Sequence, residues 1–326
     1  MNVVGLLVAI LAAAGFATST SLQHHANTTL TTSDPRGHRG PEEHHGRGEG
    51  HFASLLRQPW WVVGQAIALV AFALHAWALR VGLLVVVQPV VVSGIVLAVP
   101  IRAALERRLP HLGELGTVAL TATGLTAFLL AVHPTAPLAA HPATGSAAVA
   151  TLVGAAAALA ASRWAKGRSG IAQATGYGAA SGVLFGLSAG LVKLAATAGA
   201  TATSFPAELA AVLTAWPTWL VPLVGVAGVV LNQRAYRAAR LSASMPLLNI
   251  IDVLVAIAFG IVVFSETPAH RPLDLAGQGI GITLMLIGLH RLARDPGVDA
   301  ETQSCSLPTT SAGSAVGEPQ RTRSAR

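Results

Sequence analysis

The chain is poor in three kinds of residue, and each shortage excludes a class of protein. Its single cysteine, Cys305, excludes an intrachain disulfide framework and a cysteine-based metal site. Aromatic residues make up 5% of the chain, and its basic residues are scattered, so we expect no nucleic-acid partner. Charged residues make up only 11%, which is too few for one soluble domain of 326 residues.

The sequence contains long apolar runs in place of charged residues. Hydrophobic residues make up 52% of the chain, and the mean hydropathy is +0.59. Because about 20 helical residues span the hydrocarbon core, we looked for runs of that length bounded by charged or turn residues. Nine such runs lie at residues 2–22, 60–79, 82–100, 114–132, 146–163, 175–196, 212–231, 243–264 and 275–292. The sequence therefore predicts an all-α polytopic membrane protein with nine transmembrane helices in the lipid bilayer.

The basic residues predict the orientation of these helices. Of the 21 Lys and Arg residues, 18 fall in alternate gaps between the runs, and the other gaps hold only Arg80 and Arg271. Because cationic loops resist translocation, we expect a multi-pass protein of the cell membrane with its N-terminus outside and its C-terminus in the cytoplasm. Lys193 lies near the outer end of its helix, where we expect its amine to extend to the interface.

Composition divides the chain into segments. No Lys or Arg precedes the first run, so we expect a retained helix there rather than a cleaved signal peptide. The expected order is a first helix (1–22), a His/Gly/Arg-rich cytoplasmic loop (23–57), the rest of the first half (58–133), a linker and connecting helix (134–170), the second half (171–294) and a disordered tail (295–326).

The loop at 23–57 is rich in histidine. Neutral imidazoles in adjacent pairs chelate transition metals such as zinc or nickel, although no fixed spacing enforces one geometry here. A solvated linker without metal is the alternative. The candidate metal ligands are His24, His25, His44 and His45.

Asp252 stands alone in a long apolar run. A carboxylate at bilayer depth costs about 2.5 to 3.5 kcal/mol on insertion scales, so we expect Asp252 to have a functional or structural role. One interpretation is a proton acceptor or cation site on a transport pathway, together with Asn249 and Pro246. The other is a buried contact between helices, to a hydroxyl or to Lys193.

Three further pathway candidates lie in the first half. Gln88 and Pro89 are adjacent in the third run, where the missing N–H of proline leaves a carbonyl group unpaired. His75 lies well inside the second run, where a histidine that packs between helices is the alternative. In the sixth run, glycines recur every fourth residue at Gly178, Gly182, Gly186 and Gly190, which predicts close helix packing.

An internal repeat relates the two halves. Residues 76–106 and 233–266 both place a proline early in an apolar helix and a glutamate at its end, which aligns Pro89 with Pro246. The LGELG segment at 112–116 then matches LDLAG at 273–277, so the spacing drifts from 157 to 161. With four helices on each side of a connecting helix, the halves are inverted, as in secondary transporters.

The repeated segment, WWVVGQAIALVAFALHAWALRVGLLVVVQPVVVSGIVLAVPIRAALERRLPHLGELG, resembles the drug/metabolite transporter superfamily, in its EamA-like form. The resemblance covers most of residues 1–292. The paired Trp60 and Trp61, the nine helices and the outward N-terminus are most similar to the NIPA-type magnesium transporter branch. Members of that branch carry Gly-Glu followed by Asn-Phe where this chain has Ala71-Phe72 and His75-Ala76. Because a magnesium site requires hard oxygen ligands, the missing glutamate argues against magnesium transport.

We therefore expect a secondary transporter that moves a small hydrophobic or cationic metabolite by alternating access. The alternative is a non-transporting membrane sensor or scaffold that binds metal through the histidine loop. The chain lacks HExxH and GxSxG motifs and paired catalytic carboxylates in its helices, so we expect neither an enzyme nor a cofactor.

Overall fold

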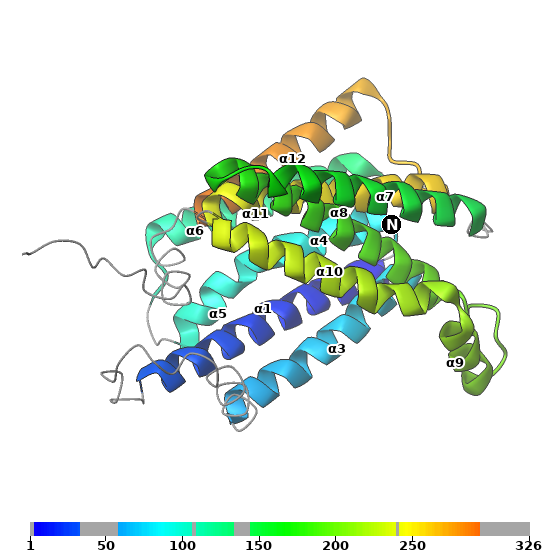
Figure 1. Ribbon diagram of the computed structural model, residues 1–326, viewed down its shortest axis with the longest axis horizontal. Coiled ribbons are helices and arrows are strands. Elements are labelled where there is room, and N and C mark those ends of the chain that lie inside the picture. Colours follow the sequence, from blue (N-terminus) through cyan, green and yellow to red (C-terminus); the bar gives the residue numbers. More distant parts are fainter. Residues whose placement is uncertain (1–2, 33–57, 106–108, 134–143, 239–240, 294–326) are drawn as a thin grey trace, which may run out of the picture.

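The computed structural model describes residues 3–32, 58–105, 109–133, 144–238 and 241–293. The described residues form a bundle of long helices and contain no β-strand (Figure 1). The helices are α1 (Val3–Thr32), α3 (Pro59–Val81), α4 (Leu84–Ser93), the 3₁₀-helix η1 (Gly94–Leu97), α5 (Ala98–Leu105), α6 (Leu112–Val132), α7 (Thr144–Lys166), α8 (Gly170–Thr197), α9 (Phe205–Thr214), α10 (Trp216–Ala238), α11 (Leu241–Phe264) and α12 (Pro272–Ala293).

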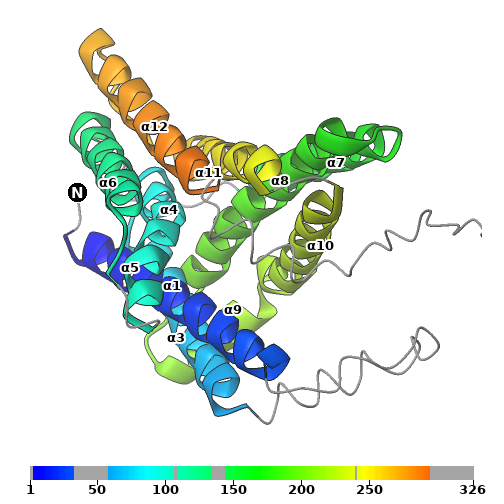
Figure 2. The same ribbon diagram turned by 90° about the vertical axis from the view of Figure 1, so that its left-hand side faces the viewer.

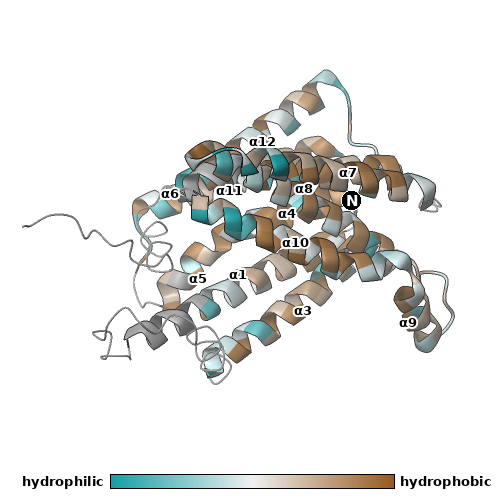
Figure 3. Ribbon diagram, viewed as in Figure 1, coloured by the Kyte–Doolittle hydropathy of each residue, from teal (hydrophilic) through white to brown (hydrophobic). Residues whose placement is uncertain are grey.

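These helices confirm a polytopic membrane protein. Among the described residues, eight spans are long and apolar enough to cross a bilayer, and the bent pair of α9 and α10 makes up to nine. Hydrophobic residues make up much of the length of the helices, and many of the hydrophilic residues lie toward the helix ends (Figure 3). The first helix differs from its predicted extent, because α1 continues to Thr32, beyond the predicted start of the loop at residue 23.

The third predicted span is broken where the sequence has proline and glycine. Pro89 lies inside α4, which ends at Ser93, and the 3₁₀-helix η1 then leads into α5. The hydroxyl of Ser93 donates to the carbonyl oxygens of Pro89 (2.8 Å) and Val90 (2.9 Å), which satisfies backbone groups at the break. At Gly94 an added Cβ would lie 2.6 Å from the Cβ of Ala13, so only glycine lets η1 approach α1.

The seventh predicted span, 212–231, is a bent pair rather than one straight helix. α9 and α10 meet at an angle of 58° across Ala215. Pro217, in the first turn of α10, has no N–H to continue the ladder to Leu213. The indole of Trp219 donates to the Leu213 carbonyl instead, at 3.0 Å.

Glycines set the closest contacts of the bundle, as the stripe on α8 predicts. Added Cβ atoms at Gly182 and Gly186 would lie 2.4 Å from the Leu248 carbonyl oxygen and 2.6 Å from the Asp252 carbonyl oxygen of α11. At Gly190 the obstacle would be the Phe259 ring. α8 therefore packs backbone to backbone on α11, and its opposite side packs on α10.

The helices begin and finish at two opposite ends of the bundle, called here the Gly82 end and the Arg234 end. At the Gly82 end, α3, α8 and α11 finish and α4 and α9 begin, whereas α10 finishes and α8 and α11 begin at the Arg234 end. α3 and α10 lie near each other toward the Gly82 end and diverge toward the Arg234 end, as two perpendicular views agree (Figures 1 and 2).

Candidate functional site

Asp252 and Gln88, which the sequence places 164 positions apart, meet inside the bundle. The Gln88 Nε2 donates to the Asp252 Oδ1 at 2.8 Å. Asp252 is 6% exposed and Gln88 is 5% exposed. The acid of α11 is therefore held by an amide of α4 rather than by a hydroxyl or by Lys193.

One atom of this contact is left without a partner. The Gln88 Oε1 is buried and accepts no hydrogen bond from any described residue. A side-chain amide has a donor end and an acceptor end, and only the donor end faces the carboxylate. If Asp252 were protonated, the same amide could turn and accept from the carboxyl O–H. The pair can thus bind both protonation states of Asp252 with one hydrogen bond.

Two of the other predicted residues lie beside this pair. Pro89 and Asn249 line one small cavity of about 20 Å³ between α4, α11 and α12. That volume is enough for about one water molecule. Pro246 belongs to the same helix, α11, one turn before Ile250, and its side chain lies outside the described set.

The structure does not place His75 beside Asp252. It lies on α3 and is 8% exposed, with its ring edge-on to Phe16 of α1 at a centroid distance of 6.2 Å. Its Nδ1 is buried without a hydrogen bond from the described residues. The geometry favours the packing interpretation, because α3 packs mainly on α1 and not on α11.

The predicted metal ligands fall largely outside the described residues. His24 and His25 belong to the last part of α1, with undescribed side chains, and His44 and His45 lie outside the described ranges. Among residues that the structure does describe, no three His, Cys, Asp or Glu side chains form a group suited to a metal ion. The histidine loop stays a prediction.

A second buried contact, missed by sequence reasoning, joins Lys193 of α8 to Glu266, which follows α11. The Lys193 Nζ lies 2.5 Å from the Glu266 Oε1, and the two side chains are 6% and 0% exposed. Lys193 also donates to the carbonyl oxygen of Gly82 at 2.7 Å. The expectation that this lysine extends to the interface is therefore wrong, because a buried carboxylate and a free helix-end carbonyl hold it inside.

Glu266 also binds the start of α4. Its two carboxylate oxygens accept from the backbone N–H groups of Leu84 (3.0 Å) and Val85 (3.1 Å). An anion suits this position, since the first N–H groups of a helix have no partner within it. The ammonium group of Lys193 at the end of α3 and the carboxylate of Glu266 at the start of α4 thus fix the sharp turn between these two helices.

The chain folds back after α11, and this places Glu266 at the start of α4. Ser265 has a φ of 52°, in the left-handed region, and the Glu266 N–H donates to the carbonyl oxygen of Gly260 at 3.1 Å. Gly260 leaves space for the carboxylate, because an added Cβ there would lie 2.7 Å from the Glu266 Oε2. The sequence signal for this residue was its place at the end of an apolar run in the second repeat.

A partly exposed ion pair lies at the same end. Arg80 of α3 pairs with Glu208 of α9, and the two side chains are 34% and 30% exposed. The Gly82 end is therefore closed by two ion pairs that connect the first half of the chain to the second.

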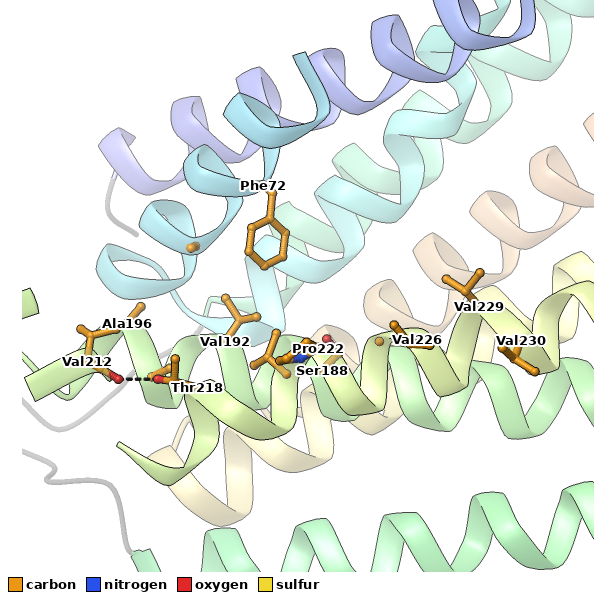
Figure 4. A pocket seen from close by; sticks show the side chains of 14 residues that line it. Phe72, Ser188, Val192, Ala196, Val212, Thr218, Pro222, Val226, Val229 and Val230 are labelled. Atoms are coloured by element: carbon orange, nitrogen blue, oxygen red, sulfur yellow. Dashed lines mark hydrogen bonds between the residues drawn. The ribbon is translucent and has the colours of Figure 1, made fainter. Parts of the chain in front are cut away.

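A large cavity lies on the other side of α8 from Asp252. It has a volume of about 700 Å³ and is bounded by α3, α8, α9 and α10 (Figure 4). Its lining comes from Phe72 and Ala76 on α3, from Ser188 and Val192 on α8, and from the length of α10.

Comparisons with known proteins leave the family open. No protein-family model matches the chain, and no solved structure matches it. The chain is 25% identical over 245 residues to an uncharacterized protein of Corynebacterium glutamicum, an alignment that covers 74% of this chain and 81% of that protein. A similar chain of comparable length therefore exists in that bacterium.

Proposed function

We propose that the chain is a secondary transporter that moves a small metabolite or cation by alternating access between two inverted halves. The observation that carries the proposal is the Asp252–Gln88 hydrogen bond of 2.8 Å. It joins α4 and α11, the two helices that the internal repeat equates. In transporters built from inverted repeats, substrate and ion sites lie between such helices near the bilayer midplane.

Reciprocal contacts between α6 and α12 support the inverted repeat. An added Cβ at Gly124 would lie 2.7 Å from the Gly281 carbonyl oxygen, and one at Gly281 would lie 2.7 Å from the Gly124 carbonyl oxygen. The same two positions would meet the backbone nitrogens of Met285 (2.6 Å) and Phe128 (2.5 Å). Such exchange of roles is what a two-fold axis between two helices produces.

The spacing of these contacts agrees with the spacing in the sequence. Gly281 follows Gly124 by 157 positions, as Met285 follows Phe128. Pro246 follows Pro89 by the same 157 positions. The agreement supports one constant spacing across the paired helices and argues against the drift to 161 suggested by the LGELG segment.

The two ends of the bundle differ, and only the Gly82 end is joined by ion pairs among the described residues. The ion pairs of Lys193 with Glu266 and of Arg80 with Glu208 join the halves at the Gly82 end. Toward the opposite end α3 and α10 diverge (Figure 1). The positive-inside rule assigns the basic Arg234 end to the cytoplasm, so we propose that the two ion pairs close the outer side of the cell-membrane protein.

Asp252 is the residue through which we propose that transport is coupled to a cation, with the proton as the simplest one. A carboxylate held by a single neutral amide lacks the several oxygen ligands that a metal cation requires. Asn249 and Pro89, the chain neighbours of this pair, border a small cavity between α4, α11 and α12. The sensor or scaffold alternative depends on the histidine loop, most of which lies outside the described residues.

A ligand screen followed by counterflow tests this function. Purified protein is screened by thermal shift against cations, amines, amino acids and uncharged hydrophobic compounds, since a ligand that binds the folded state raises its melting temperature. The strongest ligand is then loaded into proteoliposomes, and uptake of the labelled compound is followed. A carrier exchanges internal for external ligand, whereas a sensor or scaffold binds ligand without exchange. Deletion of residues 34–51 should leave counterflow intact.

A further inference from the structure

The large cavity beside α8 has a consistent chemistry. Fourteen residues line it, and none is charged. Its two side-chain hydroxyls belong to Ser188 and Thr218, and the Thr218 hydroxyl already donates to the Val212 carbonyl oxygen (Figure 4). A charged ligand would lose its hydration here without gaining a partner, which costs several kcal/mol or more. An uncharged apolar ligand has no such cost.

The size of the cavity suits a small molecule. Its volume of about 700 Å³ lies within the range of about 300 to 1,000 Å³ that is usual for small-molecule sites. Small residues, among them Ala76, Ala195 and Gly225, leave this space between the helices. At Gly225 an added Cβ would meet no atom within 4 Å, because the position opens into the cavity.

The packing of α8 keeps the cavity from collapsing. The glycine face of α8, with Gly182 and Gly186, is pressed against the backbone of α11. Ser188 and Val192 face the cavity from the same helix. A shift of α8 into the cavity would break its contacts with α11.

We infer that this cavity binds one uncharged hydrophobic molecule of drug-like size, and that the binding site lies across α8 from Asp252. The inference rests on the proposed function in making this molecule the cargo, and it narrows the cargo from metabolites and cations to uncharged apolar compounds. Asp252 then carries the coupling proton on one side of α8 while the cargo occupies the other side.

Photolabelling of the full chain in proteoliposomes tests the site directly. The probe is an uncharged adamantyl diazirine, with unlabelled adamantane-methanol as one competitor and a trimethyladamantyl-ammonium ion as the other. Labelled peptides are identified by mass spectrometry. We expect saturable labelling on the α3, α8 and α10 peptides that line the cavity, prevented by the uncharged competitor and not by the cation.

Two matched glycine variants decide between the cavity and the lipid-facing surface. Gly225 and Gly279 both have open space where a Cβ would be, but only Gly225 lines the cavity. In Gly225→Leu the saturable labelling should fall by about tenfold, and in Gly279→Leu it should stay at the wild-type level. Equal labelling in both variants, or equal competition by the cation, would overturn the inference.

A bound lipid is the remaining occupant to distinguish. If an acyl chain fills the cavity permanently, native mass spectrometry will find one lipid that is retained by the wild type, lost from Gly225→Leu and not displaced by adamantane-methanol. That result overturns an exchangeable cargo. Labelling requires no transport, so intact labelling without counterflow refutes the proposed function while leaving the binding site in place.

Discussion

The ammonium group of Lys193 lies 2.5 Å from the carboxylate of Glu266, and neither side chain is exposed by more than 6%. Together they bind the carbonyl oxygen of Gly82 and the first N–H groups of α4. This single contact therefore joins the ends of α3, α8 and α11 to the start of α4. It fixes the Gly82 end of the bundle in its closed arrangement.

Removing one partner of this pair should destabilise the protein strongly. Lys193→Met leaves the Glu266 carboxylate buried without its counter-ion, which costs about 3 to 5 kcal/mol. The double variant Lys193→Met/Glu266→Gln should recover much of that loss, because no charge is then left unpaired. Unfolding of the purified protein in detergent, monitored by circular dichroism, measures the three free energies. Arg80→Gln is the control, and its partly exposed pair should contribute about 0 to 1 kcal/mol.

The two-fold relationship between α6 and α12 makes a quantitative prediction. Gly124→Ala and Gly281→Ala insert a methyl group into equivalent backbone contacts, so each should destabilise by about 1 to 3 kcal/mol and by similar amounts. The double variant should lose less than the sum, since one separation of the helices relieves both contacts. Gly279→Ala, which faces open space on α12, is the control and should not destabilise the fold, since alanine favours a helix by up to about 1 kcal/mol over glycine. A large cost at one glycine only would contradict the symmetry.

Ser265 offers a test of the turn that delivers Glu266. Its φ of 52° is unfavourable for a residue with a Cβ, and its side chain is exposed. Ser265→Gly should therefore stabilise the fold by up to about 1 kcal/mol, since it removes a strain of about 1 to 2 kcal/mol and the extra chain entropy of glycine offsets part of that gain. Ser265→Val should destabilise the fold, because a β-branched residue tolerates this region least. Thermal unfolding of the two variants beside the wild type gives both signs. Stabilisation by valine would rule out the left-handed conformation.

Hydropathy was enough to predict the membrane-spanning helices, because a bilayer imposes a length and an apolar composition on each span. The breaks within the spans were harder to place. Pro89 signalled an irregular third span, but the 3₁₀ segment begins one turn later, where Gly94 meets Ala13. The bend at Ala215 depends on which carbonyl groups Thr218 and Trp219 satisfy, which no local pattern specifies.

The candidate site was predicted in part. An acid in an apolar run is costly, and this alone directed attention to Asp252. Its pairing with Gln88 joins residues 164 positions apart, and only the packing of α4 on α11 determines it. Lys193 was predicted to reach the interface because a lysine near a helix end usually does so. Its partner Glu266 comes from a fold-back after α11 that the sequence does not reveal.

The central claim is that Asp252 couples transport to a proton, and proton-driven uptake tests it most directly. Proteoliposomes are loaded to give a pH gradient, and accumulation of the ligand found by thermal shift is measured for the wild type and Asp252→Asn. Asparagine still accepts the hydrogen bond from Gln88, so we expect the variant to fold and to keep counterflow. We predict that its gradient-driven accumulation is lost. Accumulation equal to that of the wild type would contradict the role of Asp252.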